Sequence, residues 1–308
     1  MTTPSSPGQG EFPPNWDFSP QRHLLERLVS ESEIPKVLYH YTSGEGLAGI
    51  LRTRRLWATD VRYLNDSAEF NYALPLVAEE VRRKRELTKV HNALFEEWER
   101  AFDMASNVRV YVTAFSSKPD SLSQWRAYAR PFGFAIGLDV THVLAVATDP
   151  VDAVLFYRCV YEPRKQLEII RYGINYLIEE YDRRKREPVP PPDLVAQFGA
   201  HFLVLLLSMA ASLKHPAFEE ESEWRLVARL LASRAQVLVR RARIGPRMFI
   251  PYVELPIGTK ANPLQVAKVI IGPTPNYPLA RQGLDGLLHE TQTVVRNIDD
   301  SKVPFRDW

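Results

Sequence analysis

Apolar positions along this chain follow two spacings, and each spacing predicts a different kind of element. Segments rich in β-branched and aromatic residues are typical of strands. Segments with apolar residues three and four positions apart are typical of helices. Strands are predicted at 36–43, 56–59, 109–115 and 132–139, as a pair within 151–161, and at 223–229, 248–254 and 266–271. Helices are predicted at 20–32, around 47–51, from about 70 to 104, at 121–129 and within 165–213.

The last helical segment is interrupted by the proline run PVPPP at 188–192, which forces an extended connection and therefore two helices. The second of these, 194–213, is apolar enough to raise the question of a membrane span. Gln197, His201 and Ser208 interrupt it, and no aromatic or basic girdle brackets both ends. We therefore expect a buried core helix and no association with a membrane.

The order of these elements predicts an α+β fold. Residues 1–20, rich in Pro, Ser and Gly, are expected to form a flexible tail. Residues 21–308 are expected to form a single domain with a helical insertion at about 163–215.

Composition excludes several classes of protein. Hydrophobic residues make up 45% of the chain and charged residues 25%, which is typical of a globular domain. The 39 basic and 37 acidic residues leave a net charge of only +2, too balanced for affinity based on general phosphate neutralisation. Cys159 is the single cysteine, so no internal disulfide and no cysteine-based zinc cluster can form. With no signal-peptide pattern at the N-terminus, this favours a cytoplasmic protein.

Three segments carry candidate chemistry. LYHYTS places His40 on a strand just before a helix, AFSSKPDSLSQW ends a strand at Ser116, and FEEESEWRLV alternates so that Glu221, Glu223 and Arg225 share one face. From spacing alone, such a Glu-x-Glu-x-Arg face is usually a solvated surface with ion pairs. The functional interpretation depends on the three strand ends converging.

Together with YLNDSAEF, KHPAFEEESEWRLV, PYVEL and VIIGP, these segments resemble a bacterial family known only as domain of unknown function 2971. The resemblance runs from about Val37 to Gly272, but the family name implies no chemistry.

The three segments also resemble, more distantly, the three motifs of ADP-ribosyltransferase folds. That resemblance implies a split β-sheet core flanked by helices, with NAD bound as a substrate and no metal. His40 and Thr42 would contact the nicotinamide riboside, Ser116 would support it, and the main chain at Tyr41 would reach the nicotinamide amide. Asn65 would lie on the substrate side, or would only cap a helix.

In the same comparison Glu223 would be the catalytic carboxylate, and Glu221 would assist the acceptor. Cleavage of the bond between ribose and nicotinamide builds positive charge on the sugar, which a nearby carboxylate stabilises. A near-neutral imidazole at His40 would orient the sugar without adding charge. Arg225 could keep both carboxylates ionised.

The first expected function is therefore ADP-ribose transfer to an unknown protein or nucleic acid acceptor, or NAD hydrolysis, in a role such as bacterial defence. A metal-dependent nuclease or phosphohydrolase using Asp66, Glu69, Glu221 and Glu223 is a second hypothesis. A third is a sensor that binds a nucleotide without turnover.

Overall fold

The structure, a computed structural model, describes residues 34–64, 68–88, 90–105, 107–128, 132–146, 154–229, 240–245, 247–258 and 264–304. The predicted tail, the helix at 20–32, Asn65 and Asp66 lie outside the described residues, and nothing is described of the Glu69 side chain.

The strands and helices follow one another along the chain without repetition. The strands are β1 (Val37–Ser43), β2 (Arg55–Asp60), β3 (Val110–Ser116), β4 (Gly133–Asp139), β5 (Val154–Arg158), β6 (Glu223–Arg229), β7 (Arg240–Ile244), β8 (Phe249–Pro256), β9 (Val266–Ile271) and β10 (Val295–Asp300). The helices are α2 (Gly44–Thr53), α3 (Ala68–Thr88), α4 (Asn92–Ala105), α5 (Leu122–Tyr128), α6 (Val140–Val146), α7 (Pro163–Lys185), α8 (Leu194–Ser212) and α9 (Tyr277–Thr291), with short 3-10 turns η1 (Val61–Tyr63) and η2 (Pro216–Glu221).

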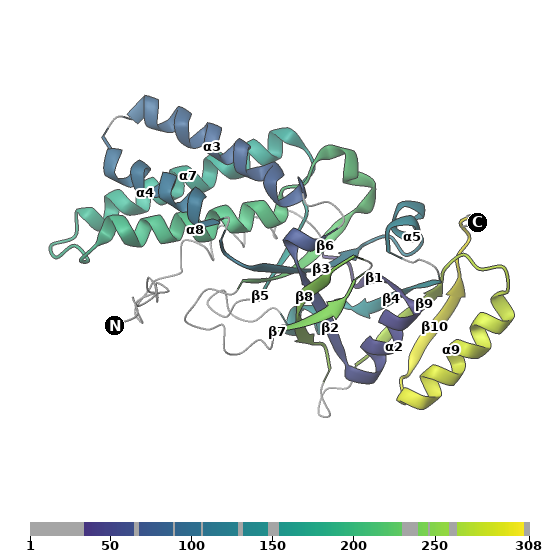
Figure 1. Ribbon diagram of the computed structural model, residues 1–308. Coiled ribbons are helices and arrows are strands. Elements are labelled where there is room, and N and C mark those ends of the chain that lie inside the picture. The colour runs from purple at the N-terminus through teal and green to yellow at the C-terminus, as the bar shows by residue number, and fades with distance from the viewer. Residues whose placement is uncertain are drawn as a thin grey trace.

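The described strands form one large mixed sheet in the order β10-β9-β4-β1-β3-β2-β8-β7, with β6 paired to β3 and β5 paired to β6 (Figure 1). Neighbours run antiparallel except β9 and β10, which are parallel. This large open sheet flanked by helices confirms the expected α+β class.

The sheet opens into a fork along one edge of β3. β1 meets β3 only at Tyr39 opposite Ser116, and β2 meets β3 only at Thr59 opposite Val112 and Asp60 opposite Tyr111. Helix α2 connects β1 to β2, and its buried residues Leu47, Ile50 and Leu51 belong to the same core as residues of both strands. We call the separation of β1 from β2 along β3 the fork.

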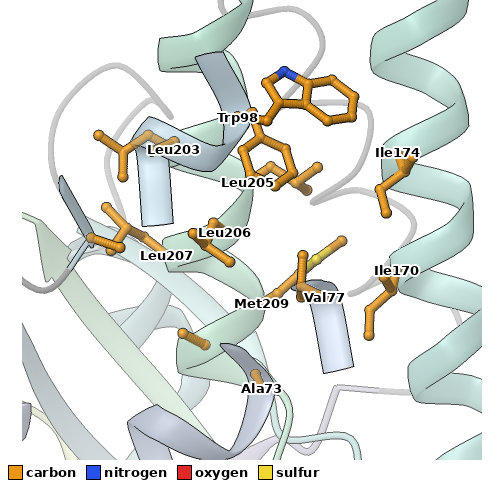
Figure 2. Packing of buried hydrophobic residues seen from close by; sticks show 14 of the residues in the cluster. Ala73, Val77, Trp98, Ile170, Ile174, Leu203, Leu205, Leu206, Leu207 and Met209 are labelled. Atoms are coloured by element: carbon orange, nitrogen blue, oxygen red, sulfur yellow. The ribbon is translucent and has the colours of Figure 1, made fainter. Parts of the chain in front are cut away.

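One face of the sheet, here the bundle face, packs against α3, α4, α7 and α8, which gather beside the sheet in Figure 1. Its core joins sheet residues such as Val112 and Val227 to helical side chains shown in Figure 2, including Trp98, Leu205 and Met209. Trp98 stacks on Phe202 with ring centroids 4.5 Å apart. Two segments far apart in sequence, 68–105 and 163–212, therefore form one helical group.

The opposite face, here the α2 face, carries a second core. Leu38, Ile136, Phe115 and Trp224 lie in this core with residues of α2, and α9 packs against it through Leu284. The sheet is consequently buried on both faces over much of its area, which explains why β3 and β4 are apolar almost throughout.

α8 is long and apolar enough to cross a membrane, but most of it is buried between α4, α7 and the sheet. Ser208, one of the polar residues that interrupt this apolar helix, forms its hydrogen bonds inside the protein. It donates to the Val204 carbonyl and accepts from the Tyr157 hydroxyl. The described residues contain no second helix of this kind.

Several sequence predictions were wrong in detail. The helical segment expected up to residue 104 is two helices, α3 and α4, and the expected strand pair at 151–161 is described as one strand, β5. α6, β7, α9 and β10 were not predicted. The break at the proline run was predicted correctly.

Candidate functional site

Glu223 opens β6 and is buried among charged partners. Its Oε1 accepts from Nε of Arg225 at 2.6 Å, and its Oε2 accepts from Nη2 of Arg225 at 2.9 Å and from Nζ of Lys214 at 2.7 Å. All three side chains are at most 6% exposed. These residues therefore form a buried ion cluster and not the solvated surface that their spacing usually indicates. Glu221 was expected on the same strand face, but it lies in the turn η2 before β6 begins.

Lys214 completes this cluster and was missed by the sequence analysis. It lies two residues after the end of α8, and its Nζ also donates to Oε2 of Glu221 at 2.5 Å and lies 5.0 Å from the centre of the Phe218 ring. The sequence did offer one signal, a single lysine just after a helix that has no charged residues. Such a lysine is expected to be buried, and a buried ammonium needs a carboxylate partner. We call Lys214, Glu221, Glu223 and Arg225 the ion cluster.

Two carboxylates and two cations balance the formal charge of the ion cluster. Burial would by itself raise the pKa of Glu223, but the charges of Arg225 and Lys214 outweigh it and hold that pKa below its ordinary value. The Glu223 main-chain N–H donates to the Tyr161 hydroxyl at 3.0 Å, and burial raises the pKa of Tyr161. Both oxygens of Glu223 are thus already engaged by protein donors.

Ser116 lies beside the ion cluster. It is directly opposite Glu223 in the β3–β6 pairing, and its Oγ donates to the Glu221 carbonyl at 2.6 Å and accepts from the Lys118 N–H at 3.1 Å. The second and third predicted motifs therefore meet on the bundle face.

His40 lies on the other side of the sheet. Tyr39 shares a face with Ser116, so the next residue of β1 points to the α2 face, where the His40 ring lies 5.8 Å from the Phe115 ring. The structure brings Ser116, Glu221 and Glu223 together but does not bring His40 to them. The expected convergence of three strand ends on one negative oxygen is not found.

At the fork, His40 is held as a neutral imidazole. Its Nδ1–H donates to the Ala114 carbonyl at 2.8 Å, because a carbonyl can only accept. Burial lowers the His40 pKa, and the nearby charge of Arg243 lowers it further, while the bond to Ala114 opposes both. Among the described residues nothing bonds to Nε2, which is left as an acceptor.

Tyr41 and Thr42 occupy different positions. The Tyr41 hydroxyl donates to the Lys118 carbonyl and accepts from the Ser121 N–H, and its ring packs edge-on against Trp125 on the bundle face. Thr42 points to the α2 face like His40, directly before the cap of α2. Asn65 cannot be placed, because it lies outside the described residues.

A second group at the fork was not predicted. Arg243 of β7 reaches over β8, where its Nη2 donates to Oγ1 of Thr59 at 3.1 Å and its guanidinium lies 5.8 Å from the centre of the Trp57 ring. Trp57 packs against Tyr252, with ring centroids 4.6 Å apart. Burial lowers the Arg243 pKa, and no carboxylate among the described residues pairs with it. Trp57 and Thr59 alternate with Leu56 and Ala58 of the α2-face core, so they lie on the bundle side of the fork with Arg243, while His40 points to the α2 face. The charge of Arg243 still acts on His40 across the fork. We call His40, Trp57, Thr59 and Arg243 the fork site.

The part of the chain that the structure describes contains no group of three His, Cys, Asp or Glu side chains that could hold a metal ion. Two residues of the nuclease hypothesis, Asp66 and Glu69, are not described in this respect.

Fold and sites together define a mixed α+β protein with a forked open sheet, a buried ion cluster on one face and, at the fork, a guanidinium that no carboxylate of the described residues pairs with. The model of a family described as "Protein of unknown function (DUF2971)" matches residues 124–226, about a third of the chain. The match includes the ion cluster but not His40, and over that stretch it supports the resemblance drawn from the sequence. No curated protein and no solved structure matches the chain.

Proposed function

We propose that this chain binds NAD at the fork site and serves as a nucleotide sensor on an ADP-ribosyltransferase-like split sheet. The observation that carries the proposal is Arg243, a partly buried guanidinium that bonds to Thr59, has no carboxylate partner among the described residues, and lies near enough for its charge to lower the pKa of His40.

Each part of a dinucleotide has a matching group at the fork. The Arg243 guanidinium with the Thr59 hydroxyl suits a phosphate, because guanidinium forms charge-assisted hydrogen bonds to phosphate oxygens. The His40 Nε2 is an acceptor for a ribose hydroxyl. Trp57, which is partly buried and packs against Tyr252, offers an aromatic surface to a base or to the nicotinamide ring.

Binding without turnover is favoured over transfer or hydrolysis by the state of Glu223. A carboxylate stabilises a developing oxocarbenium ion only if an oxygen faces the sugar, and both oxygens of Glu223 accept from Arg225 and Lys214 on the bundle face. ADP-ribose transfer to a protein or nucleic acid, or NAD hydrolysis, would require the ion cluster to rearrange.

Calorimetric titration of the full chain with NAD tests the binding site. We expect wild type to bind and Arg243→Gln to weaken binding by about tenfold or more, the order expected for the loss of one charge-assisted contact. Arg281→Gln is the matched control, because that arginine lies on α9 and pairs with Asp285. No binding by wild type, or equal binding by Arg243→Gln and wild type, would overturn the proposal.

Release of nicotinamide from NAD separates a sensor from an enzyme. The sensor proposal predicts no product from wild type over hours. Steady release that falls about 10²–10³-fold in Glu223→Gln would instead establish the transferase or hydrolase function and Glu223 as its carboxylate.

A further inference from the structure

The turn between β7 and β8 exposes large apolar side chains at an edge of the sheet. Ile244 pairs with Phe249 at the end of the hairpin, and the Gly245 N–H donates to the Met248 carbonyl at 2.9 Å. Ile244 is 87% exposed, Phe249 72% and Met248 58%. We call these three side chains the hairpin tip. Such a cluster of exposed apolar groups marks an interaction surface.

Exposed arginines lie along the hairpin that carries the tip. Arg240 and Arg241 on β7 and Arg247 in the turn are exposed. Glu254 pairs with Arg241 at 3.0 Å and with Arg55 at 3.6 Å, and it forms no ion pair with Arg240 or Arg247. The hairpin is therefore apolar at its tip and carries exposed arginines in its turn and at the start of β7.

The hairpin is anchored to the body of the sheet. Five residue pairs join β7 to β8, five join β8 to β2, and the Arg243 side chain crosses to Thr59. The tip therefore has a fixed orientation, and presenting it to a partner requires little ordering of the chain.

We propose that the hairpin tip docks this protein on a bilayer containing anionic phospholipids. Ile244, Met248 and Phe249 would enter the apolar boundary of the bilayer, while Arg240, Arg241 and Arg247 contact the anionic headgroups. The protein would lie on the surface and would not span it, so the proposal departs from the expectation of no membrane association, which rested on α8 alone. This inference does not rest on the proposed binding of NAD.

Charge and chemistry favour this partner over two others. A second copy docked tip to tip would bring the two sets of arginines together, which like-charge repulsion disfavours. A nucleic acid would suit the arginines, but its phosphates and stacked bases offer no apolar environment for Ile244 and Met248.

Sedimentation with vesicles tests the proposal on the full chain. We expect binding to phosphatidylcholine vesicles that contain phosphatidylserine, little binding to phosphatidylcholine alone, and weakening by added salt. Ile244→Ser and Phe249→Ser should each reduce binding by about tenfold, and Arg247→Gln by about fivefold. Val189→Ser and Val294→Ser are matched controls, because these valines are 84% and 79% exposed elsewhere, and they should bind like wild type.

Other outcomes would overturn the proposal. It fails if the full chain does not bind anionic vesicles, or if Ile244→Ser and Phe249→Ser bind as wild type does while their thermal unfolding is unchanged. It also fails if binding appears only after deletion of residues 1–33, which would mean that the chain covers its own tip. Binding of single-stranded RNA that Phe249→Ser abolishes, without vesicle binding, would assign the surface to nucleic acid.

Discussion

Arg225 donates to both oxygens of Glu223, two residues earlier on the same strand, at 2.6 and 2.9 Å. Residues two positions apart on a strand project from the same face, so their side chains can reach one another. Here the bundle face buries both, and Lys214 supplies the second cation.

Removal of the Glu223 charge should destabilise the protein strongly. Glu223→Gln leaves Lys214 and Arg225 buried with one carboxylate fewer, which typically costs about 3–5 kcal/mol. The matched control is Glu79→Gln, which removes an exposed carboxylate paired with Arg82 and should cost less than about 1 kcal/mol. Urea unfolding followed by circular dichroism measures both. Similar midpoints for the two variants would contradict the importance of the ion cluster.

Acid unfolding should depend on Lys214. Because the pKa of Glu223 is lower in the folded state, its contribution to stability is present above the unfolded value of about 4.3 and is lost as pH falls through the folded value. Lys214→Met removes one cause of that lowering, so the pKa of Glu223 rises and acid unfolding should begin at a higher pH than in wild type. Circular dichroism during acid titration measures this shift. An unchanged or lower midpoint would contradict it.

The His40 ring should stay neutral below pH 6.5. Its pKa is lowered by burial, so the folded state resists protonation while the unfolded chain takes up a proton near 6.5. His40 therefore costs stability increasingly as pH falls below 6.5. Nuclear magnetic resonance should find the Nδ1–H tautomer at neutral pH and a midpoint below 6.5. Titration at or above 6.5, or the Nε2–H tautomer, would exclude the arrangement at the fork.

Two glycines should respond in opposite ways to alanine. A Cβ at Gly283 of α9 meets nothing within 4 Å, so Gly283→Ala should stabilise the protein by about 0.5–1 kcal/mol through helix propensity. A Cβ at Gly173 of α7 would lie 2.9 Å from Met209 Cε and 3.0 Å from Leu205 Cδ2. Gly173→Ala should therefore gain nothing or destabilise the contact between α7 and α8. Thermal unfolding measures both, and equal stabilisation would contradict the close approach of these helices.

The sequence predicted the elements whose signal is local. Alternation and β-branched residues located β1, β3, β6 and β9, and the proline run located the break between α7 and α8. β7 was missed because three of its five residues are arginines and only Ala242 and Ile244 are apolar, too few for a clear strand signal, and β7 lies at an edge of the described sheet where only one neighbour constrains it.

Of the candidate site, the sequence by itself determined that Glu223 and Arg225 share a face, since the period of a strand is a property of the backbone. The tertiary structure decided that this face is buried against helices, that Lys214 joins it from the end of α8, and that His40 lies on the opposite face. It also brought Arg243 to Thr59 across 184 positions. Such pairings depend on strand order and register, which are fixed by how the sheet and helices pack together, and no local pattern of residues records them.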